Sequence, residues 1–123
     1  MESEWQIENS CASFGKFKRF ARKHAREYES LFANLDKIIR ILRGGNKILG
    51  FRVDFFRSEG GGVYRIGQTA VRGSKESRLY VFPDEPNRIC YILSIGDKSS
   101  QSDDINEAKN IVKQIKSKSV QKQ

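Results

Sequence analysis

Three basic residues carry the clearest chemistry in this sequence: Arg65, Arg78 and Lys98. Arg65 and Arg78 belong to runs of β-branched and aromatic residues that predict strands, and Lys98 follows a third such run. The runs occupy residues 63–66, 78–82 and 88–95. Arg and Lys side chains can neutralise a phosphate under attack by a 2′-hydroxyl, and a Lys can also transfer protons. Basic residues at the ends of these strands could therefore take part in RNA cleavage, with ion pairs to Asp or Glu as the structural alternative.

Other basic and polar residues extend this cluster into a candidate RNA-binding surface. In and around the predicted sheet, the candidates are Arg72, Lys75, Arg88 and Gln101. The first predicted helix carries an uncompensated row of cations, and the candidates there are Lys16, Arg19, Lys23 and Arg26. Helix faces normally mix charges of both signs. Such a row is consistent either with a solvated face or with contact to RNA phosphates or an acidic partner.

Residue counts exclude several other catalytic constellations. The chain has a single histidine, His24, and two cysteines, Cys11 and Cys90, without a CxxC motif. No zinc site of the usual kind and no pair of catalytic imidazoles can be assembled from these residues. The neighbouring carboxylates of Asp103 and Asp104 fall where a helix cap is expected, which favours a structural role. We expect no metal and no small-molecule cofactor.

The composition predicts one basic domain. The chain has 123 residues, and Lys and Arg outnumber Asp and Glu by 23 to 15, which gives a net charge of +8 and a pI of about 9.7. This excess favours a nucleic acid or an acidic protein as partner, with solubility alone as the other interpretation. No secretory signal and no apolar run of ~20 residues is present, so we expect a cytoplasmic protein with reduced thiols and no membrane contact.

Apolar periodicity predicts the elements that position these residues. Trp5 and Ile7 alternate with polar neighbours over residues 4–9, which indicates a short first strand. An amphipathic pattern predicts a helix over about residues 12–26, and a second apolar stripe predicts another helix that ends at Gly44. Ser30 is the predicted N-cap of that second helix. The two helices would form a hairpin over one face of the sheet.

The second half of the chain predicts a meander and a last helix. Residues 46–61 alternate weakly and either extend the sheet or lie across it. The turn at residues 83–87 contains two prolines and joins the last two of three antiparallel strands. Asp104 and Glu107 have capping-box spacing at the start of a final amphipathic helix. Residues 119–123 are expected to form a basic, disordered tail.

The order of these pieces resembles the RelE/ParE superfamily of bacterial toxins. The resemblance rests on Gly-Val-Tyr-Arg-Ile, then Ser-Arg-Leu-Tyr-Val-Phe, then Tyr-Ile-Leu-Ser-Ile-Gly-Asp-Lys, and it covers about residues 5–115. It implies a small α+β fold: an N-terminal strand, a helical hairpin packed on a three-stranded antiparallel meander, and a C-terminal helix. Residues 1–118 would form one such toxin domain, followed by the tail.

The resemblance also implies a function. It implies the toxin of a type II toxin–antitoxin system, a ribosome-dependent endoribonuclease that cuts messenger RNA. Arg65, Arg78 and Lys98 match basic positions of the family, and the resemblance implies that they are the catalytic residues. The type member has a Tyr near the C-terminal helix, at a place that falls near Ile105 here, and this departure weakens the nuclease interpretation. The alternatives are a ParE-like inhibitor of DNA gyrase and a basic RNA-binding module without toxicity. The expected partners are a cognate antitoxin protein, the ribosome and messenger RNA.

Overall fold

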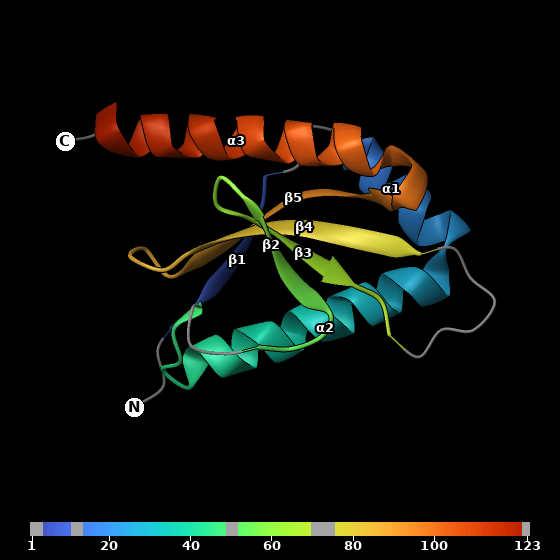
Figure 1. Cartoon of the computed structure of the whole chain (residues 1–123), viewed down its shortest axis with the longest axis horizontal. Coiled ribbons are helices and arrows are strands. Elements are labelled where there is room, and N and C mark those ends of the chain that lie inside the picture. Colours follow the sequence, from blue (N-terminus) through green and yellow to red (C-terminus); the bar gives the residue numbers. More distant parts are fainter. Residues whose placement is uncertain (1–3, 11–13, 49–51, 70–75, 122–123) are drawn as a thin grey trace.

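The computed structural model describes residues 4–10, 14–48, 52–69 and 76–121 as a five-stranded sheet between helices (Figure 1). The strand order is β1-β5-β4-β3-β2. The strands are β1 (Gln6–Asn9), β2 (Phe56–Gly60), β3 (Val63–Gly67), β4 (Ser77–Asp84) and β5 (Ile89–Asp97). The helices are α1 (Phe14–Lys23), α2 (Ala25–Arg43) and α3 (Gln101–Gln121), and a short 3₁₀ turn, η2 (Lys98–Ser100), precedes α3. The expected α+β architecture is confirmed.

The predicted three-stranded meander forms the centre of the sheet. β3 pairs with β4 and β4 pairs with β5, both antiparallel, as consecutive strands with turn-forming connections should. β1 pairs in parallel with the first half of β5, from Gln6 opposite Ile89 to Asn9 opposite Ile92. The predicted first strand therefore forms, and it lies at the edge of the sheet beside the last strand.

The segment 46–61, which the sequence left open, extends the sheet. β2 pairs antiparallel with β3, and the chain turns between them at Gly61 and Gly62 with φ angles of 62° and 89°. Two consecutive residues with positive φ form the tight hairpin turn that matches strand twist, and glycine adopts this conformation without steric cost. The alternating pattern of residues 46–61 does not coincide with β2, because Asp54 and Phe55 form a turn before the strand. Phe51, which is part of that pattern, lies outside the described residues.

Each face of the sheet is covered by one long helix (Figure 1). α2 buries Leu31, Leu35 and Ile38 in a core cluster that includes Ile66 and Ile95. α3 lies on the opposite face, where a second cluster joins its buried side chains to those of the strands: Ala108, Ile111 and Val112 with Val63, Tyr80, Phe82 and Leu93. Cys90 is fully buried in the α2-side cluster, which fits a packing role.

The boundaries of the helical hairpin differ from the prediction. The first helix ends at Lys23, the second begins at Ala25, and Arg26 therefore belongs to α2. His24 occupies the N-cap position, so Ser30 lies inside α2 and is not a cap. The Ser30 hydroxyl donates to the carbonyl of Thr69 at 2.8 Å and accepts from the backbone N–H of Thr69 at 2.8 Å. The side chain thus holds α2 to the end of β3 through a tertiary contact that the local sequence does not reveal.

The last helix also starts and ends outside its predicted limits. α3 begins at Gln101, three residues before the predicted capping box, and the carboxylate of Asp97 instead caps η2 by accepting from the backbone N–H groups of Ser99 and Ser100. α3 runs to Gln121, which places residues 119–121 in the helix rather than in the expected tail. Over the described part of the chain, none of the helices combines the length and apolarity needed to cross a membrane.

Candidate functional site

Strand register places two of the predicted catalytic residues on one face of the sheet. Arg65 on β3 lies opposite Tyr80 on β4 and opposite Arg57 on β2. Arg78 precedes Tyr80 by two residues, and side chains two apart on a strand share a face. Because Tyr80 packs in the α3-side cluster, this is the face that α3 covers. The three arginines therefore come together at the end of the sheet where β3 ends and β4 begins.

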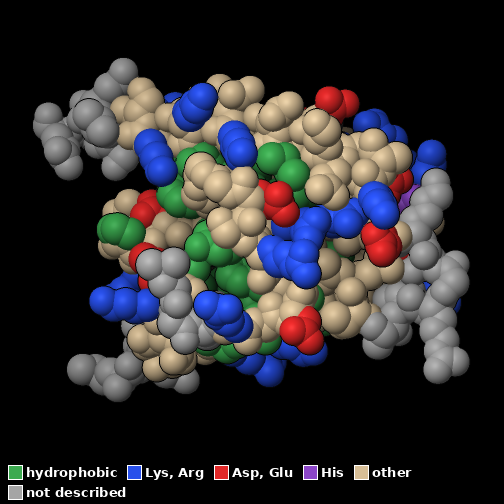
Figure 2. Space-filling model, in the orientation of Figure 1, with side chains coloured by type: hydrophobic (Ala, Val, Ile, Leu, Met, Phe, Trp, Pro, Cys, Tyr) green, Lys and Arg blue, Asp and Glu red, His purple; other side chains and the backbone are tan. Residues whose placement is uncertain are grey.

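These arginines line a pocket of about 260 Å³, called here the arginine pocket. Its walls are Arg57, Arg65 and Arg78 with Asp54, Phe55, Gly67, Gln68, Glu76 and Ser77. Figure 2 shows a group of Lys and Arg side chains between α3 and α2, near the end of β3, with acidic side chains beside it. The sequence analysis missed Arg57. Pairing residues 56–60 with 63–67 around the glycine turn would have placed it opposite Arg65.

Both predicted arginines have carboxylate partners, as the structural alternative expected, but the contacts are long. Arg65 Nε lies 3.4 Å from Glu59 Oε1, and Arg78 Nη2 lies 3.4 Å from Glu76 Oε2. The Arg78 side chain is only 13% exposed whereas Glu76 is 67% exposed. Arg78 Nη1 is buried and donates to no acceptor among the residues that the structure describes. A buried guanidinium N–H without an acceptor is costly, which makes the pocket suited to an added oxygen ligand.

Tyr80 lies beneath this cluster. Its side chain is fully buried, and its hydroxyl has no hydrogen-bond partner within the described part of the chain. Burial raises the pKa of Tyr80 well above its ordinary value, and the charge of Asp104 raises it further, while Arg78 and Arg65 oppose the shift. The hydroxyl consequently stays protonated, as a neutral donor between the arginines and Asp104.

Lys98 lies beside the arginine pocket rather than in it. It is exposed and lines a neighbouring hollow of about 270 Å³ with Glu76, Asp97 and Ser99. Its backbone N–H donates to the carbonyl of Glu76 at 3.1 Å. Glu76 lines both hollows and so connects Lys98 to Arg78. Gln101 is the first residue of α3 and directly follows η2, after the end of β5.

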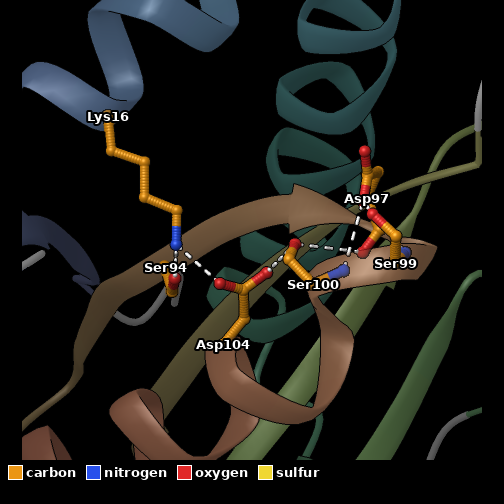
Figure 3. Close-up of polar contacts among 6 residues, drawn as sticks. All are labelled: Lys16, Ser94, Asp97, Ser99, Ser100 and Asp104. Carbon is orange, nitrogen blue, oxygen red and sulfur yellow. Dashed lines mark hydrogen bonds and ion pairs between the residues drawn. The ribbon is translucent and has the colours of Figure 1, made fainter.

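Lys16, predicted to bind RNA, is instead held in a polar network called here the α1–α3 junction: Lys16, Ser94, Ser100 and Asp104 (Figure 3). Lys16 Nζ lies 2.6 Å from Asp104 Oδ1 and donates to Ser94 Oγ at 3.0 Å. Ser100 Oγ donates to Asp104 Oδ2 at 2.6 Å. The Asp104 side chain is 4% exposed, so Lys16 neutralises a buried carboxylate and is not a free phosphate-binding cation.

The remaining predicted RNA-binding residues are dispersed. Arg19 and Lys23 are exposed on α1, and Arg26 is exposed on α2. Arg88 lies in the turn before β5, at the opposite end of the sheet from Arg78, which pairs with Gly96. Arg88 and Gly96 are eight positions apart, which along a strand is roughly 26 Å, so Arg88 is not part of the cluster. Arg72 and Lys75 lie outside the described residues.

No protein-family model and no curated protein sequence matches this chain. Among solved structures it is similar to the free state of a double arginine-to-alanine mutant of the E. coli toxin RelE, with a TM-score of 0.53 and 17% sequence identity. The similarity covers 88% of this chain and 95% of that chain. The chain therefore has a RelE-like fold, as the sequence resemblance predicts.

Proposed function

We propose that this chain is the toxin of a type II toxin–antitoxin system and that it cleaves messenger RNA on the ribosome, with the arginine pocket as its phosphate site. The observation that carries the proposal is the convergence of Arg57, Arg65 and Arg78 on one pocket, where a buried guanidinium N–H lacks an acceptor among residues 4–10, 14–48, 52–69 and 76–121. The RelE-like fold supports the same function, since the similar structure is that of a toxin.

The arginines supply charge neutralisation. A guanidinium can hold a phosphate through two parallel hydrogen bonds, and a phosphate oxygen would give Arg78 Nη1 the acceptor it lacks. The ion pairs of Arg65 and Arg78 are long, and the Glu76 carboxylate is mostly exposed, so its displacement by phosphate costs little. As negative charge grows on the phosphate during attack, donors already in place lower the barrier.

Cleavage requires two proton transfers beside this site. The 2′-oxygen of the ribose forms a bond to phosphorus as the bond from phosphorus to the 5′-oxygen breaks, which leaves a 2′,3′-cyclic phosphate. Glu76, which touches Arg78 and lines the pocket, accepts the 2′-hydroxyl proton in this scheme. Lys98, across the shared wall, gives a proton to the departing 5′-oxygen.

The composition of the pocket supports a need for the ribosome. Its walls include two carboxylates, Asp54 and Glu76, which reduce its net positive charge and therefore its attraction for free RNA. The chain has no pair of imidazoles for proton transfer. Alignment of the 2′-hydroxyl with the scissile bond must then come from outside, and a ribosome that holds the message can provide it.

The proposal implies a second protein that neutralises this chain. A net charge of +8 favours an antitoxin with an acidic segment, whose association with the toxin slows as salt rises.

Induction of the chain in a bacterial host tests the proposal. We expect growth arrest, with messenger RNA cut while it is translated and intact when translation initiation is blocked. Growth arrest with intact messages and loss of DNA supercoiling would assign the chain to gyrase inhibition instead. Normal growth at high levels of folded protein would exclude both kinds of toxin.

A further inference from the structure

A second hollow adjoins the arginine pocket. It measures about 620 Å³ and is lined by Arg52, Val53, Asp54, Phe56, Arg57 and Tyr64, among others, and we call it the aromatic hollow. Asp54 and Arg57 line both spaces, so the two hollows share a wall. Side chains alternate along β2 and β3, so Phe56 and Tyr64 lie on the α2 face of the sheet, whereas Arg57 and Arg65 lie on the other.

The aromatic hollow contains a pair of stacked rings. The ring centroids of Phe56 and Tyr64 are 4.8 Å apart, with an angle of 10° between the ring planes. Both side chains are half-buried, in contact with the core on one side and still accessible on the other. Phe56 lies on β2, the edge strand, and Tyr64 lies on the next strand, β3, over which α2 also packs; both side chains keep part of their surface exposed. A flat ligand can therefore reach them from solvent.

We propose that the aromatic hollow binds a nucleobase of the RNA strand whose phosphate occupies the arginine pocket. This inference rests on the proposed function and gives the site a second subsite. In a nucleotide the base and the phosphate are joined through one sugar, so two subsites with a common wall suit neighbouring parts of one strand. Base stacking on aromatic side chains is a general mode of single-strand recognition, and every base has a face that can stack.

The charges around the rings fit a base. Arg52 and Arg57 can stack on a base or donate to its carbonyl and ring nitrogens, and the carboxylate of Asp54 can accept from an exocyclic amino group. Burial raises the pKa of Tyr64, with a further contribution from Glu85, so its hydroxyl remains neutral. The hollow would take an uncharged planar ring with hydrogen-bonding edges, while the phosphate stays with the three arginines.

Titration of the methyl-labelled chain, followed by NMR, tests the subsite. The probes are adenosine 5′-monophosphate, cytidine 5′-monophosphate and, as the matched ligand without a base, ribose 5-phosphate. We expect both nucleotides to bind on the order of tenfold more tightly than ribose 5-phosphate, the effect of one stacked base. The nucleotides should also shift the methyl signals of Ile48 and Val53, which line the hollow, by ring currents.

Two leucine substitutions localise the effect. Tyr64→Leu removes the ring and should bring nucleotide affinity close to that of ribose 5-phosphate, while Tyr64→Phe should retain the difference. Tyr28→Leu is the matched control, because Tyr28 forms a comparable half-buried pair with Phe32 on α2, with centroids 4.5 Å apart. This variant should bind all three probes as the unsubstituted chain does.

The outcomes separate this inference from the proposed function. Equal affinity for nucleotides and ribose 5-phosphate, with no shift at Ile48 or Val53, would overturn the base subsite. The proposal that the arginine pocket binds phosphate would not be affected by that result. If ribose 5-phosphate fails to bind, or binds equally after Arg78→Ala, the arginine pocket is not a phosphate site and both proposals fail. Should Tyr64→Leu not fold, the comparison of probes on the unsubstituted chain still decides the question.

Discussion

The arginine pocket and the α1–α3 junction use the same chemistry on the same face of the sheet with different results. A row of paired residues joins them, because Arg65 lies opposite Tyr80 and Tyr80 lies opposite Ser94. In the junction, Lys16 and Asp104 are 2.6 Å apart and the carboxylate is buried. In the pocket, the arginine–carboxylate contacts are 3.4 Å and the Arg78 partner is mostly exposed.

The difference shows when a basic side chain has a structural role. The Asp104 carboxylate also accepts from the Ser100 hydroxyl, so each of its oxygens has a donor and removal of a partner would leave a charge buried. Arg78 has the reverse arrangement, with a buried donor and a loosely held partner. The basic character of a residue predicts neither outcome. The geometry and burial of its carboxylate partner decide it.

The largest contrast is expected from Arg78→Ala. If Arg78 stabilises charge on the scissile phosphate, its loss should raise the barrier by about 2–4 kcal/mol, roughly 30- to 1000-fold in rate. Cleavage of a translated message in a cell extract measures the effect, with a melting curve as the check on folding. Arg88→Ala, at the far end of β5, is the comparison and should reduce cleavage much less. A folded Arg78→Ala protein at full activity would show that the arginine pocket is structural too.

Substitution of Asp104, in the α1–α3 junction, should lower folding stability. Asp104→Ala leaves the Lys16 ammonium and the Ser100 hydroxyl without their carboxylate, and we expect a loss of about 2–3 kcal/mol in the free energy of unfolding. Urea denaturation measures this loss. The control is Asp36→Ala, which removes an exposed partner of Arg40 at 3.0 Å and should cost less than about 0.5 kcal/mol. Equal losses from both variants would make the junction an ordinary surface pair.

Gly96→Ala tests how tightly the junction is built. A Cβ at Gly96 would overlap the carboxylate of Asp104 and crowd the Ser100 hydroxyl, so we expect a destabilisation of about 1–3 kcal/mol. Gly67→Ala is the control in the pocket region, since its nearest neighbouring atom is a backbone oxygen 4.0 Å away. The double variant should lose less stability than the sum of the Gly96→Ala and Asp104→Ala losses, because both substitutions act on one contact.

The smallest effect is expected from Tyr80→Phe, between the two regions. Among the described residues the buried Tyr80 hydroxyl has no partner, so its removal should stabilise the fold by about 1 kcal/mol. Burial raises the pKa of Tyr80 in the folded state above the ordinary value of 10.0, so ionisation of Tyr80 in the unfolded chain should lower the stability of the native protein as pH rises above that value. Urea denaturation at pH 8 and above pH 10 should show a shallower decline for the variant. A marked loss of stability at pH 8 would reveal a hydrogen bond to this hydroxyl.

Most helices and strands, and much of the arginine pocket, can be predicted from local sequence patterns. β-Branched runs and proline-rich turns predict a meander, and the antiparallel register of β3 and β4 then brings Arg65 and Arg78 to one face. These inferences depend on local pattern and on neighbouring strands, which the sequence encodes over short distances. The same reasoning could have placed Arg57 opposite Arg65, because the two-residue glycine turn pairs β2 with β3.

Which cations are held in structural ion pairs depends on the three-dimensional packing of the chain. Lys16 and Asp104 are separated by 88 positions, and the sequence pattern assigned one to RNA and the other to a helix cap. Their contact exists because α1 and α3 both pack beside β5, where Gly96 leaves space for the carboxylate. A charge pair between distant segments depends on how helices dock on a sheet. That docking is set by the summed packing of the core, which no local pattern of charges records.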